Sequence, residues 1–352
     1  MKTLTQKFRN LKNSKTVTNI LKNAIGLSVI FLFGSCMPDN EVEPFQPQPD
    51  GQALNERFLD NRNDAVQEFI IDASVGGTVI GAQGTKVQFQ ANSFGINGVP
   101  VTGNVTVQLL EIYDKASMLL KNKSTLGQRP NGDKEVLKSA GEFFIDAKQG
   151  TNELELLENA TVTSREIDPA NVDGAMQIFK TGGLDNDCDG IDDDCDWVEA
   201  DDNGDGINDK PVIRDGQNTT GGSYVTYGFD ISSFGWTNLD RWYSFTGPKT
   251  EIYVDVPAGY NGDNCAVYLS YDGEPTALAK MDIWDTTTEM FTEHYGLIPI
   301  GQQVHIIVVT EIDGELHYAI QGTTVIDNHI EIITSLSPIT QAALESLING
   351  LP

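Results

Sequence analysis

Apolar and polar residues alternate over residues 68–166, which is typical of β-strands that are buried on one face. The run "TKVQFQ" places Val87 and Phe89 on one face, and "NVTVQLLEI", "GEFFIDA" and "NELEL" continue the alternation. Turn sequences rich in Gly, Pro and Asn separate these runs. We therefore expect an antiparallel β-sandwich over 68–166, interrupted by one short helix over 113–122.

The alternation returns over residues 222–336 and predicts a second antiparallel β-sandwich. Within "TEIYVDV" the residues Ile252, Val254 and Val256 share one face, and "CAVYLSY", "QVHIIVVTE", "LHYAIQ" and "TVIDNHIEII" supply further strands. The tail 337–352 contains "SPITQAALESLING", in which Ser337 and Pro338 suit a helix start and Gly350 a helix stop. The predicted fold is all-β, with two sandwich domains and a short C-terminal helix.

The net charge of the chain indicates which classes of partner it can bind. The chain of 352 residues carries a formal net charge of −28, and its hydrophobic fraction of 39% is sufficient for folded cores. A surface this acidic repels nucleic acid and attracts divalent cations. We expect no nucleic-acid partner.

The first 35 residues have the pattern of a secretory signal peptide. Six basic residues and no acidic residue precede Cys36, and the apolar run "AIGLSVIFLF" is followed by "GSC". This end resembles the lipobox of bacterial lipoproteins, although Phe33 stands where Leu is commonest. The resemblance implies that Cys36 is acylated and becomes the mature N-terminus, which anchors the chain to a membrane. An ordinary secretory signal with an incidental Cys is the other interpretation.

Residues 36–67 are rich in Pro, Asn, Gln and acidic residues, which predicts a flexible tether. The acidic residues Asp39, Glu41 and Glu43 resemble the surface-export signal of Bacteroidota-type lipoproteins. That resemblance implies an outer-membrane lipoprotein on the cell surface. The periplasmic face of the outer membrane is the alternative location.

Between the two alternating stretches, residues 167–221 form an acidic segment that we expect to be the linker. Its part "LDNDCDGIDDDCDWVEADDNGDGINDKP" contains the pattern D-x-D-x-D-G-I and, sixteen residues later, D-x-N-x-D-G-I. Alternate oxygen-bearing side chains followed by Gly are the chemistry of Ca²⁺ loops, but neither copy has the Glu at position 12 that an EF-hand requires. The predicted ligands are Asp185, Asp187, Asp189, Asp192, Asp196, Asp201, Asn203, Asp205 and Asp209.

The doubled pattern resembles thrombospondin type-3 repeats, which implies Ca²⁺ held by these side chains. Asp193 or Asp194 is an alternative ligand in the first copy. Without cations so many carboxylates repel one another, so we expect Ca²⁺ to make the segment compact. Cys188 and Cys195 are candidates for a disulfide around the first site, which leaves Cys265 as an odd thiol. An acidic flexible linker without metal is the competing interpretation.

A second resemblance covers the first sandwich. The stretch from Gly76, "GGTVIGAQGTKVQFQANSFGINGVPVTGNVTVQLLEIYDKASMLL", with "KSAGEFFIDA", resembles the β-sandwich module shared by ankyrins and netrin receptors. It is also similar to modules of uncharacterised Bacteroidota surface lipoproteins. Both resemblances imply a scaffolding or interaction domain, and neither brings a catalytic residue.

Other chemistry has weaker support. His294, His305, His317 and His329 suggest zinc only if strands bring them together, and no metal motif accompanies them. Trp236 and Trp242, in the densest aromatic cluster, are candidate glycan contacts if exposed and core residues if buried. No hydrolase motif is present.

These observations predict a non-enzymatic surface lipoprotein with a structural or adhesive role. Its partner is an unknown protein or glycan, and Ca²⁺ is expected to make the segment between its domains rigid. A glycan-binding accessory lipoprotein is the second hypothesis, and a hydrolase with an unrecognised site is the third.

Overall fold

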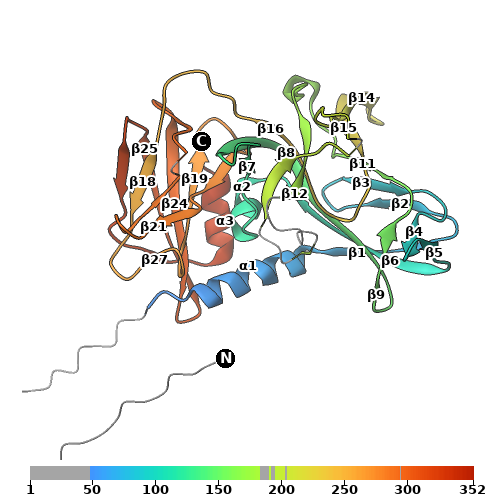
Figure 1. Ribbon diagram of the computed structural model, residues 1–352, viewed down its shortest axis with the longest axis horizontal. Helices are drawn as coiled ribbons and strands as arrows, with labels where there is room; N and C mark the ends of the chain where they lie inside the picture. The colour runs from blue at the N-terminus through green and yellow to red at the C-terminus, as the bar shows by residue number, and fades with distance from the viewer. Residues whose placement is uncertain (1–47, 183–189, 192–194, 203, 294) are drawn as a thin grey trace, which may run out of the picture. The chain divides into compact units, whose positions relative to one another are not determined.

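Strands are the main regular secondary structure of this computed structural model, which describes residues 48–182, 190–191, 195–202, 204–293 and 295–352 (Figure 1). The fold of the described residues is all-β, as the alternation predicts. Their helical elements are α1 (Gly51–Ala65), α2 (Lys115–Leu120), α3 (Gln341–Asn349) and the 3-10 turn η1 (Pro169–Asn171).

The largest sheet has eight strands. Its strands are, in spatial order, β1 (Gln67–Asp72), β6 (Asn104–Ile112), β8 (Lys134–Gln149), β16 (Gly235–Trp242), β12 (Gln177–Gly182), β13 (Asp196–Glu199) and β7 (Leu126–Gln128), with β9 (Asn152–Glu153) beside β8. Strand β7 also pairs with β8, so β8, β16, β12, β13 and β7 close into a ring. Closure leaves these five strands without a free edge, whereas β1 remains at an edge of the sheet.

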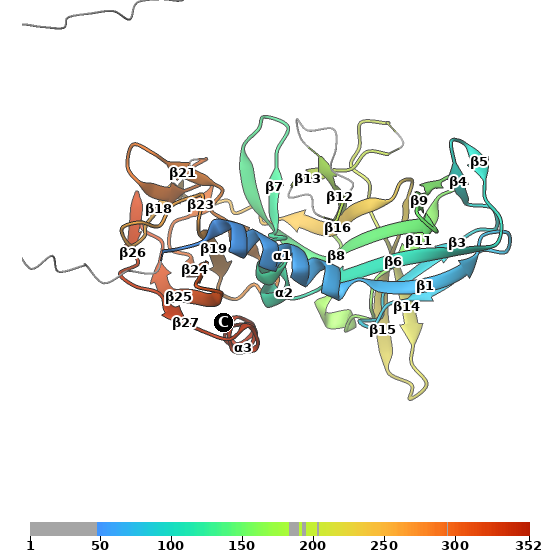
Figure 2. The ribbon, with the colours of Figure 1, turned by 90° about the horizontal axis from the view of Figure 1, so that it is seen from below.

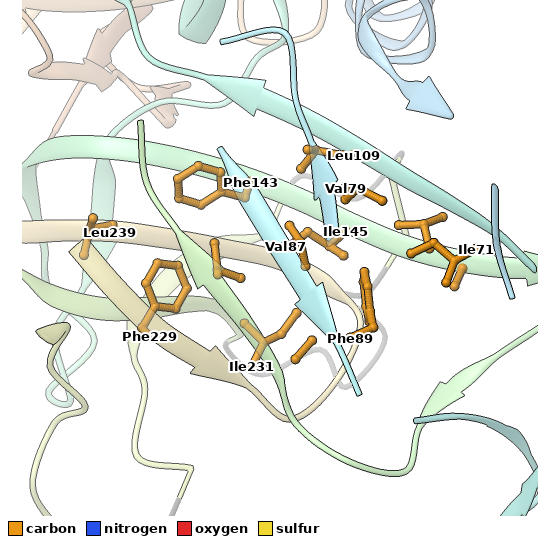
Figure 3. Packing of buried hydrophobic residues seen from close by; sticks show 14 of the residues in the cluster. Ile71, Val79, Val87, Phe89, Leu109, Phe143, Ile145, Phe229, Ile231 and Leu239 are labelled. Carbon is orange, nitrogen blue, oxygen red and sulfur yellow. The ribbon is translucent and has the colours of Figure 1, made fainter. Parts of the chain in front are cut away.

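A second sheet packs face to face with the first. It comprises β14 (Val212–Gln217), β15 (Ser223–Ile231), β11 (Ala160–Thr163), β3 (Lys86–Phe89) and β2 (Gly77–Ile80). A separate small sheet of β10 (Glu155–Leu156), β4 (Phe94–Ile96) and β5 (Val99–Pro100) packs against it through Phe94 and Phe89. Figure 3 shows Val87 and Phe89 of β3 pointing toward Phe143 and Ile145 of β8. The alternation in "KVQF" therefore does place its apolar residues in a core.

The remaining strands form a second group. One sheet comprises β20 (Leu278–Lys280), β19 (Ala266–Tyr271), β24 (Gln303–Ile312), β25 (Glu315–Thr324) and β27 (Ser337–Pro338). The facing sheet comprises β21 (Ile283–Asp285), β22 (Met290–Thr292), β18 (Ile252–Asp255) and β26 (His329–Ile332), and β17 (Lys249–Thr250) pairs with β23 (Ile298–Pro299). Strands β18 and β26 run parallel, so this group is not purely antiparallel.

The domain boundaries expected from the sequence are wrong in the middle of the chain. Strands β12, β13 and β14, all within the expected linker 167–221, belong to the two sheets of the first group. Strands β15 and β16 also join that group, although they were expected in the second sandwich. The acidic segment therefore connects strands of one group instead of joining two domains.

The two groups of strands share a hydrophobic core. From Gln46 to Pro352 the chain forms one compact unit. A single cluster of buried residues contains Trp197 and Trp236 from the first group, Tyr268 and Ile307 from the second, and residues of all three α-helices. Backbone bonds also cross between the groups, including Thr125 N–H to Leu278 O at 2.8 Å. The expected hinge between two modules is absent from the described residues.

Strands β6 and β8 are buried on both faces, which explains why apolar residues stand next to each other in their sequences. Leu109 and Phe143 face the core between the first two sheets. Their neighbours Leu110 and Phe144 face the shared core instead. Central strands of this kind carry nearly continuous apolar runs.

Helix α1 corrects the expectation of a flexible tether over 36–67, because residues 51–65 are folded and docked (Figure 2). Asp50 caps the helix by accepting the Ala53 N–H at 3.0 Å. Leu54 and Phe58, four residues apart on one face, are 3% and 2% exposed in the shared core. The part of the predicted tether before residue 48 lies outside the described residues.

The other two helices also differ in detail from expectation. The helix predicted over 113–122 is confirmed as α2, and Met118 is fully buried. The C-terminal helix begins at Gln341 with Thr340 as its N-cap, because Ser337–Pro338 pairs with β25 as β27. Its buried side chains, Leu344 and Ile348, pack in the shared core.

Candidate functional site

The acidic segment begins as the connection between two paired strands. Strand β12 lies between β16 and β13 in the large sheet, with Thr181 opposite Trp197. Trp197 is 2% exposed, and its Nε1 donates to Ser124 O at 2.9 Å. Gly182, before the first acidic repeat, and Asp196, at its end, are thus paired across the sheet.

Most predicted ligands of the first repeat lie outside the described residues. These are Asp185, Asp187, Asp189 and Asp192, together with the alternatives Asp193 and Asp194 and the cysteine Cys188. Cys195 is disulfide-bonded, whereas Cys265 is a free buried thiol. The pairing of Cys195 with Cys188 stays a prediction.

Asp196 has a cationic partner that the sequence did not indicate. Its Oδ1 lies 2.9 Å from Lys134 Nζ on β8, and the same ammonium lies 2.6 Å from Asp282 Oδ2. Burial lowers the pKa of Lys134, but its hydrogen bonds and charge interactions with Asp282 and Asp196 outweigh burial and raise that pKa. Asp196 therefore takes part in an ion pair through Oδ1, and its role as a calcium ligand stays a prediction.

The second repeat forms a closed loop at the end of β13. Asp201 Oδ1 accepts the Asp205 N–H at 3.0 Å, and Asp201 Oδ2 accepts the Gly206 N–H at 2.8 Å. Asp205 Oδ1 accepts the Ile207 N–H at 2.8 Å. Gly206 has φ +77°, the left-handed conformation that its place in the pattern requires.

Asp209 closes this loop from the other side. Its Oδ2 accepts the Asp202 N–H at 2.8 Å, and its backbone N–H donates to Ala200 O at 2.8 Å. Asn203, the remaining predicted ligand, lies outside the described residues. The loop thus brings Asp201, Asp205 and Asp209 into one short closed turn.

The donors of this loop are all oxygen atoms, which is the ligand chemistry of Ca²⁺. Each carboxylate oxygen keeps a lone pair after accepting one N–H, so the hydrogen bonds above do not prevent coordination. Within the described ranges, however, no three His, Cys, Asp or Glu side chains are arranged to hold a metal ion. Any complete site would need donors from beyond these ranges or a local rearrangement.

The proposed glycan contacts Trp236 and Trp242 are wrong, because both side chains are buried. They are 2% and 6% exposed and belong to the shared core. Trp236 Nε1 donates to Gly190 O at 3.0 Å, and Trp242 Nε1 donates to Glu199 Oε1. Phe144 lies against Trp236, and Phe179 meets Trp242 edge to face. The cations of Lys123 and Arg129 lie over the Trp236 and Trp242 rings, 4.4 and 3.5 Å from the ring centroids, so neither ring is open to a sugar.

The histidines that the structure describes have separate partners. His305 Nδ1 lies 2.7 Å from Asp272 Oδ1, and His329 Nε2 lies 3.0 Å from Glu331 Oε2. His317 Nδ1 lies 3.0 Å from Glu315 O, and His294 falls outside the described residues. The described histidines are thus paired singly along the strands.

Sequence reasoning missed a cleft beside α1. Its lining includes Leu54, Phe58, Asp282 and Trp284. Leu54 and Phe58 come from a helix that was expected to be a tether, and Asp282 and Trp284 come from in and beside β21, far along the chain. Only the folded arrangement brings them together.

No family model matches the sequence, and no curated protein matches it significantly.

Proposed function

We propose that this chain is a membrane-anchored, surface-exposed lipoprotein with a structural or adhesive role. In this proposal Cys36 carries the lipid, and the residues after it lead to a rigid unit of two β-sandwiches. The proposal rests on the lipobox-like sequence and the acidic residues that follow it. No helix among the described residues is long and apolar enough to cross a membrane.

The observation that carries the structural role is the attachment of α1. This helix comes directly after the anchor-proximal segment, and its Arg57 pairs with Glu311 on β24. Leu54 and Phe58 of the same helix lie in the core shared by both groups of strands. A mechanical force applied at the anchor would therefore be transmitted through α1 to a single folded unit. This property suits a spacer or an adhesin.

Ca²⁺ has a narrower role in this proposal than the sequence indicated. The two groups of strands already share a core, so an ion is not needed to orient them. We propose that Ca²⁺ orders the acidic repeats themselves, and that Asp201, Asp205 and Asp209 contribute oxygen ligands in the second one. Weak binding, with Kd about 10⁻⁴ to 10⁻³ M, is the range of extracellular calcium modules.

Acylation is tested by expressing the full chain in a lipoprotein-processing bacterium with a labelled fatty acid. Wild type should incorporate the label and fractionate with membranes, whereas Cys36→Ala should lose both properties. Cys265→Ala is the matched control, because this buried thiol should not affect either readout. Membrane fractionation of Cys36→Ala together with absence of label in wild type would refute the lipid anchor.

The side of the membrane is tested on intact cells of a surface-exporting host. Protease added outside should digest wild-type protein, whereas a periplasmic marker should stay intact. Protection of the protein until the outer membrane is opened would assign it to the periplasmic face instead.

A further inference from the structure

A cleft of about 280 Å³ lies between the first two turns of α1 and the second group of strands. The turn containing Gly262 and the segment from Lys280 to Trp284 form its other walls. Near Asn55 and Phe58 it borders a second hollow of about 670 Å³ that follows α1. The volume lies just below the usual range for small-molecule sites, which suits a single ring.

One wall of the cleft is aromatic. Phe58 and Phe291 are buried, whereas Trp284 is only half-buried. The other three tryptophans of the chain are all buried. Trp284 and Phe291 meet edge to face, with centroids 5.0 Å apart and planes at 67°. The buried phenylalanine thereby supports the half-exposed indole.

Two glycines show how tightly these walls are assembled. A Cβ added at Gly262 would meet Trp284 Cβ at 2.8 Å. A Cβ added at Gly51 would meet the Asp263 carbonyl oxygen at 1.8 Å. Only glycine permits the turn to lie this close to both Trp284 and the start of α1, so the cleft is preformed.

Asp282, one of the residues that line the cleft, carries an unsatisfied acceptor. Asp282 Oδ2 accepts from Lys134 Nζ at 2.6 Å and from Tyr295 Oη at 3.2 Å. Asp282 Oδ1 is buried and has no hydrogen-bond partner among the described residues. A buried carboxylate oxygen without a donor is rare, and a ligand hydroxyl would supply one.

We propose that this cleft binds one pyranose ring of a sugar or glycan. The C–H face of the ring packs on Trp284, and its hydroxyls bond to Asp282 and to the exposed rim residues Asn55 and Asp263. Asp282 shares the Lys134 ammonium with Asp196, and a second ammonium, that of Lys280, lines the cleft. The site therefore favours a neutral hydroxyl over a cation. The buried acceptor in turn disfavours a purely apolar ligand.

This site uses none of the residues in the acidic repeats and does not depend on the lipid. Sugar binding can therefore fail while the lipid anchor holds, and the reverse is also true. It is also distinct from the buried Trp236 and Trp242.

The experiment is saturation-transfer NMR with calorimetry on the full chain, carrying Cys36→Ala for solubility, in EDTA. The probes are the methyl glycosides of glucose, galactose, mannose and N-acetylglucosamine. At least one should show saturable binding in the millimolar range, strongest at the C–H groups of one ring face. Trp284→Ala and Asp282→Asn should each weaken it about tenfold, and Trp284→Phe should weaken it less.

Asp60→Asn is the matched control, because Asp60 is an exposed carboxylate on α1 that does not line the cleft. Thermal unfolding of each variant distinguishes lost binding from lost structure. If Trp284→Ala does not fold, the binding measured for Asp282→Asn tests the proposal. The proposal is overturned if none of the four glycosides binds saturably, or if the folded variants bind as wild type does.

Discussion

Trp197 and Trp236 meet edge to face in the shared core, with ring centroids 6.5 Å apart and planes at 76°. Trp197 belongs to the acidic segment, and Trp236 belongs to a central strand of the large sheet. This contact builds the acidic segment into the fold, because a linker would have no reason to bury an indole there.

Replacing Trp197 with Ala should therefore destabilise the whole unit. Truncation of a buried aromatic residue costs about 3–5 kcal/mol of unfolding free energy. Urea denaturation followed by circular dichroism measures this loss. Trp284→Ala is the control, because a half-buried indole should cost less. Wild-type stability in Trp197→Ala would show that β13 is not an integral strand.

Arg57 and Glu311 hold α1 to the second group of strands. The Glu311 side chain is only 2% exposed, and its backbone oxygen also accepts the Asp50 N–H at 2.8 Å. Arg57→Ala should cost about 1–3 kcal/mol, since it leaves a buried carboxylate without its cation. Hydrogen exchange should increase over residues 51–65.

A double variant separates the ion pair from general damage to α1. Adding Glu311→Gln to Arg57→Ala should recover part of the loss, because the buried charge is gone. Asp60→Ala, on the exposed face of the same helix, should leave exchange unchanged. Equal exchange in Arg57→Ala and wild type would mean that the ion pair does not hold the helix.

The sequence predicted strands best where burial is one-sided. Strand β3 alternates as expected, with Val87 and Phe89 buried. The sequence did not predict β13, a strand of four residues that pairs in parallel with β7 through Trp197. Such pairing depends on residues far away in the chain. Because Trp197 is surrounded by acidic residues, the local sequence indicates an exposed segment although the indole is buried.

Helix α1 and the candidate sites were missed for related reasons. Leu54 and Phe58 are the only apolar side chains of α1 buried in the core, so its apolar stripe is too narrow to distinguish it from a tether. The burial of Trp236 and the half-exposure of Trp284 depend on tertiary packing, which local sequence does not encode. The pattern around Asp201 is a local signal, and the residues there do form a closed loop, whereas Ca²⁺ in that loop stays a prediction.

Calcium should protect the acidic segment without changing the arrangement of the strands. Limited proteolysis of residues 184–211 should slow in millimolar Ca²⁺, and calorimetry should give a Kd of about 10⁻⁴ to 10⁻³ M. Asp201→Ala should weaken binding, whereas Asp215→Ala, an exposed carboxylate on β14, should not. Cleavage at the same rate with and without Ca²⁺ would contradict the proposed ordering.

The shared core predicts a further outcome of the same experiment. Small-angle scattering profiles of the folded unit should coincide with and without Ca²⁺, because packed residues and not the ion fix the two groups of strands. A large change in the radius of gyration on adding Ca²⁺ would restore the idea of a hinge.

Two buried carboxyl groups at the irregular pairing of β8 and β16 should make stability fall as pH rises. Asp240 and Glu142 are fully buried. Burial raises the pKa of Asp240 to about 8. Burial, followed by the charge of Asp240, raises the pKa of Glu142 well above its usual value. Lys121 and Lys123 oppose this shift without cancelling it.

The sign follows from proton binding. Above pH 4 the unfolded chain releases the proton of Asp240, whereas the folded chain keeps it until about pH 8. The native state therefore binds more protons, and stability decreases by up to about 1.4 kcal/mol per pH unit for one such group. This stabilisation is complete below pH 4 and lost as pH rises through 8.

Asp240→Asn should remove the part of this dependence that comes from Asp240, because an amide does not titrate, whereas the part that comes from the burial of Glu142 should stay. The amide oxygen can still accept from Asn238 Nδ2, which lies 2.7 Å from Asp240 Oδ2 in wild type. Urea unfolding at pH 5, 6, 7 and 8 should show the variant gaining stability relative to wild type at each step. Asp285→Asn is the control: hydrogen bonds from Thr287 and Thr288 lower the pKa of Asp285, so it stays ionised throughout this range. Parallel pH profiles for wild type and Asp240→Asn would show that Asp240 is already ionised in the folded protein.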